Sequence, residues 1–212
     1  MSLVELVIAL LVVSPAADRK GDLFDDIAAR SASVRQTLQT VRAAFVETTS
    51  STLLTKPLVE RGQLVAMRPA RLKLSYTEPR GKTIIVDEKR LQLIWPDRQL
   101  HEESNIEQAQ KRVQQYFVDT SPEALRKHFV IDAVEDVAAP GRYRIDLRPT
   151  RKQIQQGLEH LQLWLDRTTF QLSEMRMVFS GGDSKTLVFT HVVLNEPVDA
   201  ATFGVPGSPP DR

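Results

Sequence analysis

The strongest constraint on the fold is an alternation of apolar and polar side chains that begins near residue 46 and continues to residue 100. In its clearest stretch Leu72, Leu74 and Tyr76 alternate with charged or polar residues. A period of two places all the apolar side chains on one face of an extended strand. Turn-forming residues, such as those at 79–81 and 96–97, interrupt the alternation about every ten residues. Short strands joined in this way predict an antiparallel meander with one apolar face.

The alternation returns in the second half of the chain. It predicts further strands at 129–134, 143–147, 158–165, 172–179 and 186–194. Gly141, residues 166–167 and residues 181–183 provide turns between them. A sheet of about ten strands with a single apolar face curls instead of staying flat. We therefore expect a mainly β (α+β) fold, built as a single curved antiparallel half-barrel of about ten or eleven strands.

Three other stretches have a helical pattern. Residues 22–45 carry apolar side chains mostly at intervals of three and four, with no Pro or Gly among them. Asn105 can cap a second helix, in which Ile106, Val113 and Phe117 lie along one face. The sequence Ser121-Pro122 favours the start of a third helix, which we expect to end near residue 127. The first helix and the central pair are expected to cover the concave face, with the central pair as a lid.

The composition excludes several kinds of chemistry. The chain has no cysteine, so disulfides, thiolate nucleophiles, metal sites built on sulfur and a lipid anchor on an N-terminal cysteine are excluded. Lys and Arg number 28 against 27 for Asp and Glu, which leaves no basic surplus for nucleic acid. The four histidines lack metal-ligand spacing, and no nucleophile elbow or nucleotide-binding loop is present. We expect no enzyme activity, metal or cofactor.

The few polar residues that suggest chemistry have simpler interpretations. Glu102 and Glu103 are adjacent on a strand and point to opposite faces, so a solvated edge is favoured over a pair of catalytic acids. His191 lies in an apolar strand, where a core histidine is favoured over a catalytic one. Residues 181–183, Gly-Gly-Asp, are typical of a hairpin turn.

The two ends of the chain differ from the rest. Residues 1–17 contain an apolar run from Leu6 to Val13 followed by small residues, as in a secretory signal. The run is shorter than the roughly 20 residues that a membrane span needs. Glu5 and the lack of a preceding basic residue count against a signal, and the alternative is a buried or frayed N-terminal segment. Residues 207–212 are rich in proline and are expected to be disordered or to lie along the surface.

Several motifs resemble one family of carriers. The segment 62–79, GQLVAMRPARLKLSYTEP, and the segment 84–96, IIVDEKRLQLIWP, are similar in order and spacing to motifs of the LolA family of lipoprotein carriers. Residues 43–45, 147–149, 194–198 and 203–206 resemble the family's opening helix and closing motifs. The resemblance covers residues 22–206, which we expect to be one lipid-binding domain. The turn 87–89 lacks the family's glycine, and leucines replace aromatic residues in the strand from Leu72, so the ligand can differ.

The resemblance implies a function and partners. A LolA-like protein is expected to be a periplasmic monomer that binds acyl chains of lipoproteins in a hydrophobic cavity. Its expected partners are an inner-membrane ABC-type release complex and an outer-membrane receptor. The receptor branch of the fold is anchored through a lipidated cysteine, which this chain lacks, so the soluble-carrier branch is favoured. A carrier of another lipid, a lipid-sensing regulatory module on the same fold, and a secreted hydrolase remain as alternatives.

The candidate site residues follow from the alternation and the resemblance. Those predicted to line the cavity are Leu72, Leu74, Tyr76, Ile84, Val86, Leu91, Leu93, Trp95, Leu163, Leu165, Met175 and Met177. The same side chains can instead form ordinary core. Arg68, just before Pro69, is either a surface arginine at a strand bend or, as the resemblance implies, the residue that ties the barrel to its lid. A guanidinium has five donors, enough for several backbone carbonyls.

Overall fold

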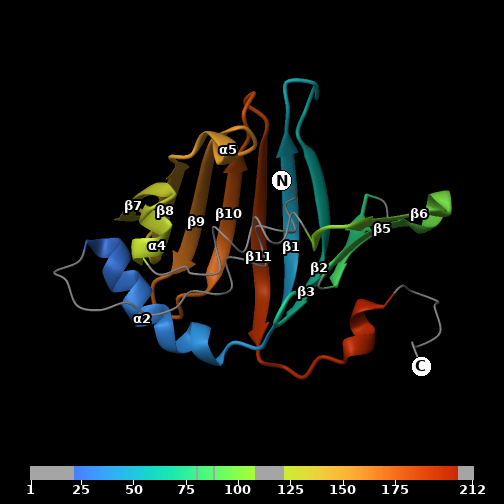
Figure 1. Cartoon of the computed structure of the whole chain (residues 1–212), viewed down its shortest axis with the longest axis horizontal. Helices are drawn as coiled ribbons and strands as arrows, with labels where there is room; N and C mark the ends of the chain where they lie inside the picture. Colours follow the sequence, from blue (N-terminus) through green and yellow to red (C-terminus); the bar gives the residue numbers. More distant parts are fainter. Residues whose placement is uncertain (1–21, 80, 88, 108–121, 205–212) are drawn as a thin grey trace.

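The computed structural model describes residues 22–79, 81–87, 89–107 and 122–204, and its centre is one antiparallel sheet (Figure 1). Within these residues the sheet has 11 strands in the order β6-β5-β4-β3-β2-β1-β11-β10-β9-β8-β7. The strands are β1 (Thr40–Ser50), β2 (Leu58–Met67), β3 (Arg71–Glu78), β4 (Lys82–Asp87), β5 (Arg90–Trp95), β6 (Leu100–Asn105), β7 (Phe129–Glu135), β8 (Arg142–Pro149), β9 (His160–Asp166), β10 (Leu172–Val178) and β11 (Ser184–Leu194). The predicted mainly β, antiparallel architecture is confirmed.

The sheet consists of two meanders that meet at its centre. One runs from β1 to β6 and the other from β7 to β11, and β1 pairs with β11. β6 and β7 are the two edges and do not pair with each other, so the sheet is an open half-barrel. Five short helical elements accompany it: α2 (Leu23–Thr37), α4 (Pro122–Arg126), α5 (Lys152–Gln155), η1 (Pro96–Arg98) and η2 (Ala200–Phe203) are those found in the described residues.

The two faces of the sheet carry cores of different size. The inner face, which carries Phe45, Leu74 and Met175, belongs to a large apolar cluster that extends into α2 and α4. α2 and α4 pack beside β7, at one side of the half-barrel (Figure 1). The outer face has a small cluster in which Ile85 and Ile94 pack against residues of the C-terminal segment. Most of the apolar material therefore lies on the inner face.

The first helix is shorter than its sequence pattern predicts. α2 begins at its N-cap Asp22, whose side chain accepts hydrogen bonds from the amides of Phe24 and Asp25. It ends at Thr37, and Val41 and Phe45 lie on β1 instead, so the prediction of a helix over 22–45 is wrong at its C-terminal end. An interval of four between Val41 and Phe45 satisfies the strand period as well as the helical one. Pairing of β1 with strands on both sides selects the strand.

The helix expected after residue 121 is confirmed as α4, whereas α5 had no recognised pattern. Every residue of β6 is exposed, so the interpretation of Glu102 and Glu103 as a solvated edge is confirmed. The turn at 181–183 joins β10 to β11, and both of its glycines have positive φ.

The prediction for His191 is wrong. This residue is exposed and has a φ of 52°, at the irregularity where the register of β1 and β11 shifts. The extra residue on β11 turns the histidine away from the core that its neighbours face.

Several predicted segments lie outside the described residues. These are the signal-like segment 1–17, the tail 207–212 and most of the central lid, including Val113 and Phe117. Ile106 is described: it is buried, and its amide donates a hydrogen bond to the Lys89 carbonyl at 2.7 Å. Among the described helices, none has the length and apolar character needed to cross a membrane.

Candidate functional site

The register of the sheet brings the predicted cavity residues of β3, β4 and β5 together. Directly paired residues of antiparallel strands lie on the same face. Two rows cross the three strands, Leu74–Ile84–Leu93 and Leu72–Val86–Leu91. Tyr76 and Trp95 lie on the same face, two residues farther along β3 and β5, toward the end of the sheet where the β1–β2 hairpin lies. We call these eight residues the apolar stripe.

The other side of the half-barrel extends the stripe across the inner face. Met175 pairs with Leu163, and Met177 lies one inward-facing position farther along β10. Leu165 pairs with Tyr143 of β8, which belongs to the same cluster. All twelve residues predicted to line a cavity therefore occupy strands β3–β5 and β9–β10, and ten of them are part of the large inner cluster.

The stripe differs in burial from one strand to the next. Leu72 and Leu74 on β3 have no exposed surface, as expected of core residues. Leu91, Leu93 and Trp95 on β5 are only partly buried. The stripe therefore becomes more accessible from β3 toward β5.

A pocket opens where the stripe meets the end of the sheet. Its volume is about 320 Å³. It is lined by Leu58, Glu60, Pro79, Gly81, Lys82, Trp95, Asp97 and Arg98, and we call it the mouth pocket. Trp95 belongs both to the stripe and to the mouth pocket, so the two are continuous. A volume of this size is at the lower end of the range of small-molecule sites.

A chain of polar groups crosses the inner face near the mouth pocket. Glu47 on β1 is fully buried, accepts a hydrogen bond from the Tyr76 hydroxyl at 2.7 Å and pairs with Lys185 at 2.5 Å. Burial, reinforced by the negative charge of Glu47, raises the pKa of the Tyr76 hydroxyl. The predicted cavity residue Tyr76 is therefore a neutral donor to a buried carboxylate.

Lys82 connects this chain to the mouth pocket. Its ammonium lies 3.9 Å from the centroid of the Tyr76 ring and 3.0 Å from Glu60 Oε1. Both charged side chains are largely buried, with 20% and 14% exposure. The inner face thus changes from apolar to polar along the strands, as a surface for an amphiphile does.

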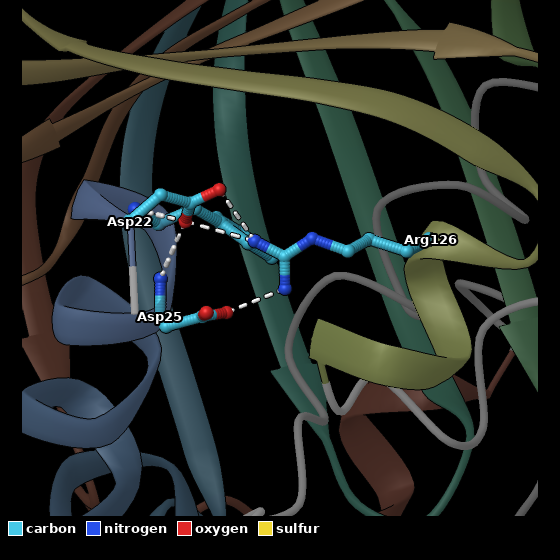
Figure 2. A network of polar contacts seen from close by, with 4 residues as sticks. Asp22, Asp25 and Arg126 are labelled. Atoms are coloured by element: carbon cyan, nitrogen blue, oxygen red, sulfur yellow. Dashed lines mark hydrogen bonds and ion pairs between the residues drawn. The ribbon is translucent and has the colours of Figure 1, made fainter. Parts of the chain in front are cut away.

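A second polar network joins the two helices at the opposite side (Figure 2). The guanidinium of Arg126 in α4 donates to both carboxylate oxygens of Asp22, at 2.8 and 2.7 Å, and to Asp25 at 2.5 Å. The same guanidinium lies 5.4 Å from the centroid of the Phe24 ring. Although partial burial acts in the other direction, hydrogen bonds from Arg126 and from backbone amides lower the pKa of Asp22. We call this network the helix tie.

Sequence reasoning selected a different arginine for this kind of role. Arg68 lies in the turn between β2 and β3, and its amide donates to the Gln39 carbonyl at 2.9 Å. Most of the lid that it was expected to contact, residues 108–121, lies outside the described residues, so its role stays a prediction. Arg126 and its partner Asp22 are more than 100 residues apart in the chain. Nothing local in the sequence indicates that pairing.

The described residues offer no metal site. Within them, no group of three or more His, Asp or Glu side chains is close enough to hold a metal ion.

Comparison with known families identifies the architecture. The model of the family described as outer membrane lipoprotein carrier protein LolA matches residues 36–206. The chain belongs to the LolA family. The resemblance expected from the sequence motifs is thereby confirmed, and the LolA family is one of carriers and binding proteins. No curated protein sequence matches the chain.

Several solved structures are similar to this chain at low sequence identity. An uncharacterized conserved protein from Thermus thermophilus is 10% identical, with a TM-score of 0.54 over 90% of this chain and 96% of that one. A LolA superfamily protein from Nitrosomonas europaea is 11% identical, with a TM-score of 0.40 over 80% and 92%. A chain of the Pseudomonas aeruginosa MucA/MucB complex is 13% identical, with a TM-score of 0.46 over 79% and 56%. Identities this low concern the fold alone.

Proposed function

We propose that the chain is a periplasmic carrier that binds the acyl chains of a lipoprotein, or of another lipidated molecule, and moves it between the inner and outer membranes. One observation supports this above all others. The apolar stripe lies in register across three strands and ends at an open pocket. Membership of the LolA family is consistent with the same role.

The burial of the stripe sets the scale of the binding energy. Moving an acyl chain from water into an apolar site contributes about 0.8 kcal/mol per methylene, so ten carbons contribute roughly 8 kcal/mol. However, Leu72, Leu74 and Met175 are already shielded from water. An acyl chain must displace the groups that shield them, which offsets part of the gain. A carrier needs this offset because it has to release its cargo.

In this proposal α2 and α4 cover the inner face, and the helix tie holds these two helices in the closed position. α2 and α4 pack against the same edge strand, and Arg126 holds them together. In this proposal the two helices move away as the acyl chain enters and return as it leaves. The sequence has no motif that couples to an energy source. Direction therefore comes from the partners, an inner-membrane ABC-type release complex and an outer-membrane receptor.

The test is extraction of labelled lipid from vesicles by the purified chain, with a charge placed on the accessible part of the stripe. Leu93→Glu lies on the partly buried strand β5, so we expect it to fold but to lose at least about tenfold in affinity, because the carboxylate must be desolvated beside an acyl chain. The matched control is Val193→Glu, since Val193 is an exposed apolar residue on β11 whose neighbours in the strand face the inner cluster.

The outcomes separate the alternatives. A carrier extracts lipid stoichiometrically and without chemical change, and Val193→Glu extracts as well as the wild type. A hydrolase would release a product from the labelled lipid with turnover. Circular dichroism verifies the fold of each variant. A folded Leu93→Glu variant that extracts lipid normally would contradict a role for the stripe.

A further inference from the structure

The mouth pocket contains an unusual balance of charge. Lys82 and Glu60 in its wall are paired with each other and are mostly shielded from water. Asp97 and Arg98, both in η1, are exposed at the opening and form no ion pair with any described residue. Among its described lining residues, the pocket therefore presents one available cation, Arg98, and one available anion, Asp97, next to the ring of Trp95.

This balance discriminates between kinds of ligand. A purely anionic group near Arg98 also meets the unpaired carboxylate of Asp97, which opposes its binding. A group that carries both signs can satisfy Arg98 and Asp97 together. A guanidinium suits phosphate oxygens because its donors form parallel hydrogen bonds. A ligand ammonium is attracted both to a carboxylate and to the face of a tryptophan ring.

The connection to the apolar stripe restricts the ligand further. Leu93 lies two residues before Trp95 on β5 and on the same face, roughly 7 Å along the strand. A molecule whose polar part occupies the mouth pocket can therefore lay an apolar tail on Leu93 and Leu91. The pocket itself, at about 320 Å³, has room for a head group and leaves the tails to the stripe.

We propose that the mouth pocket binds the zwitterionic head group of a phospholipid, with its phosphate at Arg98 and its ammonium between Asp97 and Trp95, while an acyl chain lies on the apolar stripe. This inference rests on the proposed lipid-carrier function and names the class of lipid. It assigns Asp97 and Arg98 as the residues that select the head group.

The test measures binding of short-chain phospholipids by calorimetry, below the concentration at which they form micelles. Dihexanoyl lipids with phosphocholine, phosphoethanolamine and phosphoglycerol head groups share the same tails and differ only in the head. We expect the wild type to bind the two zwitterionic lipids about tenfold more tightly than the phosphoglycerol lipid. An excess of inorganic phosphate should not compete, which distinguishes a lipid head group from free phosphate.

Two variants locate the selection in the mouth pocket. Asp97→Asn removes only the anion, so it should weaken binding of the zwitterionic lipids and remove their advantage over phosphoglycerol. Arg98→Ala removes the partner of the phosphate and should weaken binding of all three lipids. The matched control is Arg176→Ala, since Arg176 is an exposed arginine of β10 between two residues that face the inner cluster. It should bind all three lipids as the wild type does.

Failure of the head-group site can be distinguished from failure of the carrier function. If the three lipids bind with equal affinity and neither variant changes that affinity, the head-group site is wrong, whereas acyl binding by the stripe stands. Competition by inorganic phosphate would also overturn the head-group site. If neither short-chain lipids nor vesicle lipids bind at all, the head-group site and the carrier function are both wrong.

Discussion

Gly62 lies at a close approach between β2, β3 and the Phe45 ring on the inner face. A Cβ atom at this position would be 2.3 Å from the Ser75 carbonyl oxygen and 2.8 Å from the Phe45 ring. That ring in turn meets Tyr76 edge to face, with centroids 5.0 Å apart. Because one of the two obstacles is backbone, β2 or β3 must shift to accept even a methyl group.

We therefore predict that Gly62→Ala lowers the free energy of unfolding by about 1–3 kcal/mol. Urea unfolding followed by circular dichroism measures it. Gly81→Ala is the control, because a Cβ there has no neighbour within 4 Å. Equal stability of the two variants would show that the close approach around Gly62 relaxes without cost.

For individual residues, the sequence predicts the face of the sheet on which a side chain lies, but not the side chains to which it forms hydrogen bonds. A period of two was enough to place Leu72, Leu74 and Tyr76 on the inner face, because it depends only on local backbone geometry. The hydrogen bond from Tyr76 to Glu47 depends on the register of β1, β2 and β3 together. Register is set by contacts across the whole sheet, so the buried carboxylate could not be foreseen from the sequence.

The helix tie is the element-scale feature most open to experiment. Arg126→Leu keeps an apolar side chain against Phe24 and removes the donors to Asp22 and Asp25. These groups are partly exposed, so we expect a loss of about 1 kcal/mol or less. The loss should appear as faster amide exchange in residues 23–37, with little change in the strands. Arg167→Leu is the control, since it removes a comparably exposed ion pair, with Glu135, that involves no helix.

The pH dependence gives an independent check on the tie. The pKa of Asp22 is lowered in the folded chain, so its stabilising contribution is complete above the ordinary value of 3.8 and is lost as the pH falls through the lower, folded value. Asp22→Asn keeps a capping side chain but removes the charge. Its stability difference from the wild type should therefore be present at neutral pH and disappear in acid. A constant difference would mean that the cap alone matters.

The β1–β2 hairpin carries an apolar tip beside the mouth pocket. Leu53 is 90% exposed, and Leu54, Leu58 and Val59 are exposed as well. The hairpin extends beyond the neighbouring strands at the top of Figure 1. Leu58 also lines the mouth pocket, so a lipid surface touched by the tip would face the opening. Exposed apolar clusters of this kind mark contact sites.

We predict that replacing both Leu53 and Leu54 with Ser slows lipid extraction from vesicles several-fold, because less apolar surface enters the bilayer. The affinity for monomeric short-chain lipid and the stability should not change. Val130 and Val137 are exposed on and next to β7, at the other edge of the sheet, and replacing both with Ser is the control. If the two double variants extract lipid at the same rate, the tip has no part in membrane contact.

Secondary structure was predicted well where the apolar residues followed a single period. It was predicted poorly where they fitted both the strand period and the helical period. The strands β3 and β8 follow the alternation closely. The stretch from Thr40 to Phe45 satisfied both helix and strand, and only its pairing with β2 and β11 decides between them. α5 is a single turn, too short to produce a recognisable period.

At the scale of the whole molecule, the two halves of the sheet are joined by a strand pairing that no local sequence pattern predicts. Sequence neighbours in a meander pair by default, which accounts for β1 to β6 and for β7 to β11. The pairing of β1 with β11 joins the two meanders, although these strands are the first and the last along the chain. The segment after β11 fastens the same junction, since Asn195 accepts a hydrogen bond from the Gln39 amide and Arg42 pairs with Glu196.

From that junction the C-terminal segment continues across the outer face. Phe203 of η2 is 3% exposed and packs with Ile85 and Ile94. The Thr202 carbonyl accepts a hydrogen bond from Lys73 at 2.9 Å, which holds the segment to β3. The β3–β5 side of the half-barrel is thus covered on its outer face by residues that follow the last strand. This small core is separate from the inner one.

Phe203→Ala tests whether the two cores stabilise different parts of the sheet. Losing a buried phenylalanine costs about 3–5 kcal/mol in a large core, and we expect the lower value here because the cluster is small. The loss should appear as faster amide exchange in β4 and β5, while β9 and β10 keep their protection. Phe129→Ala, in the inner core, should instead weaken protection in all strands, because that cluster spans the sheet. If Phe203→Ala lowers protection equally in β4 and β10, the half-barrel unfolds as one unit. The outer cluster would then stabilise the whole fold and not only the side that carries the mouth pocket.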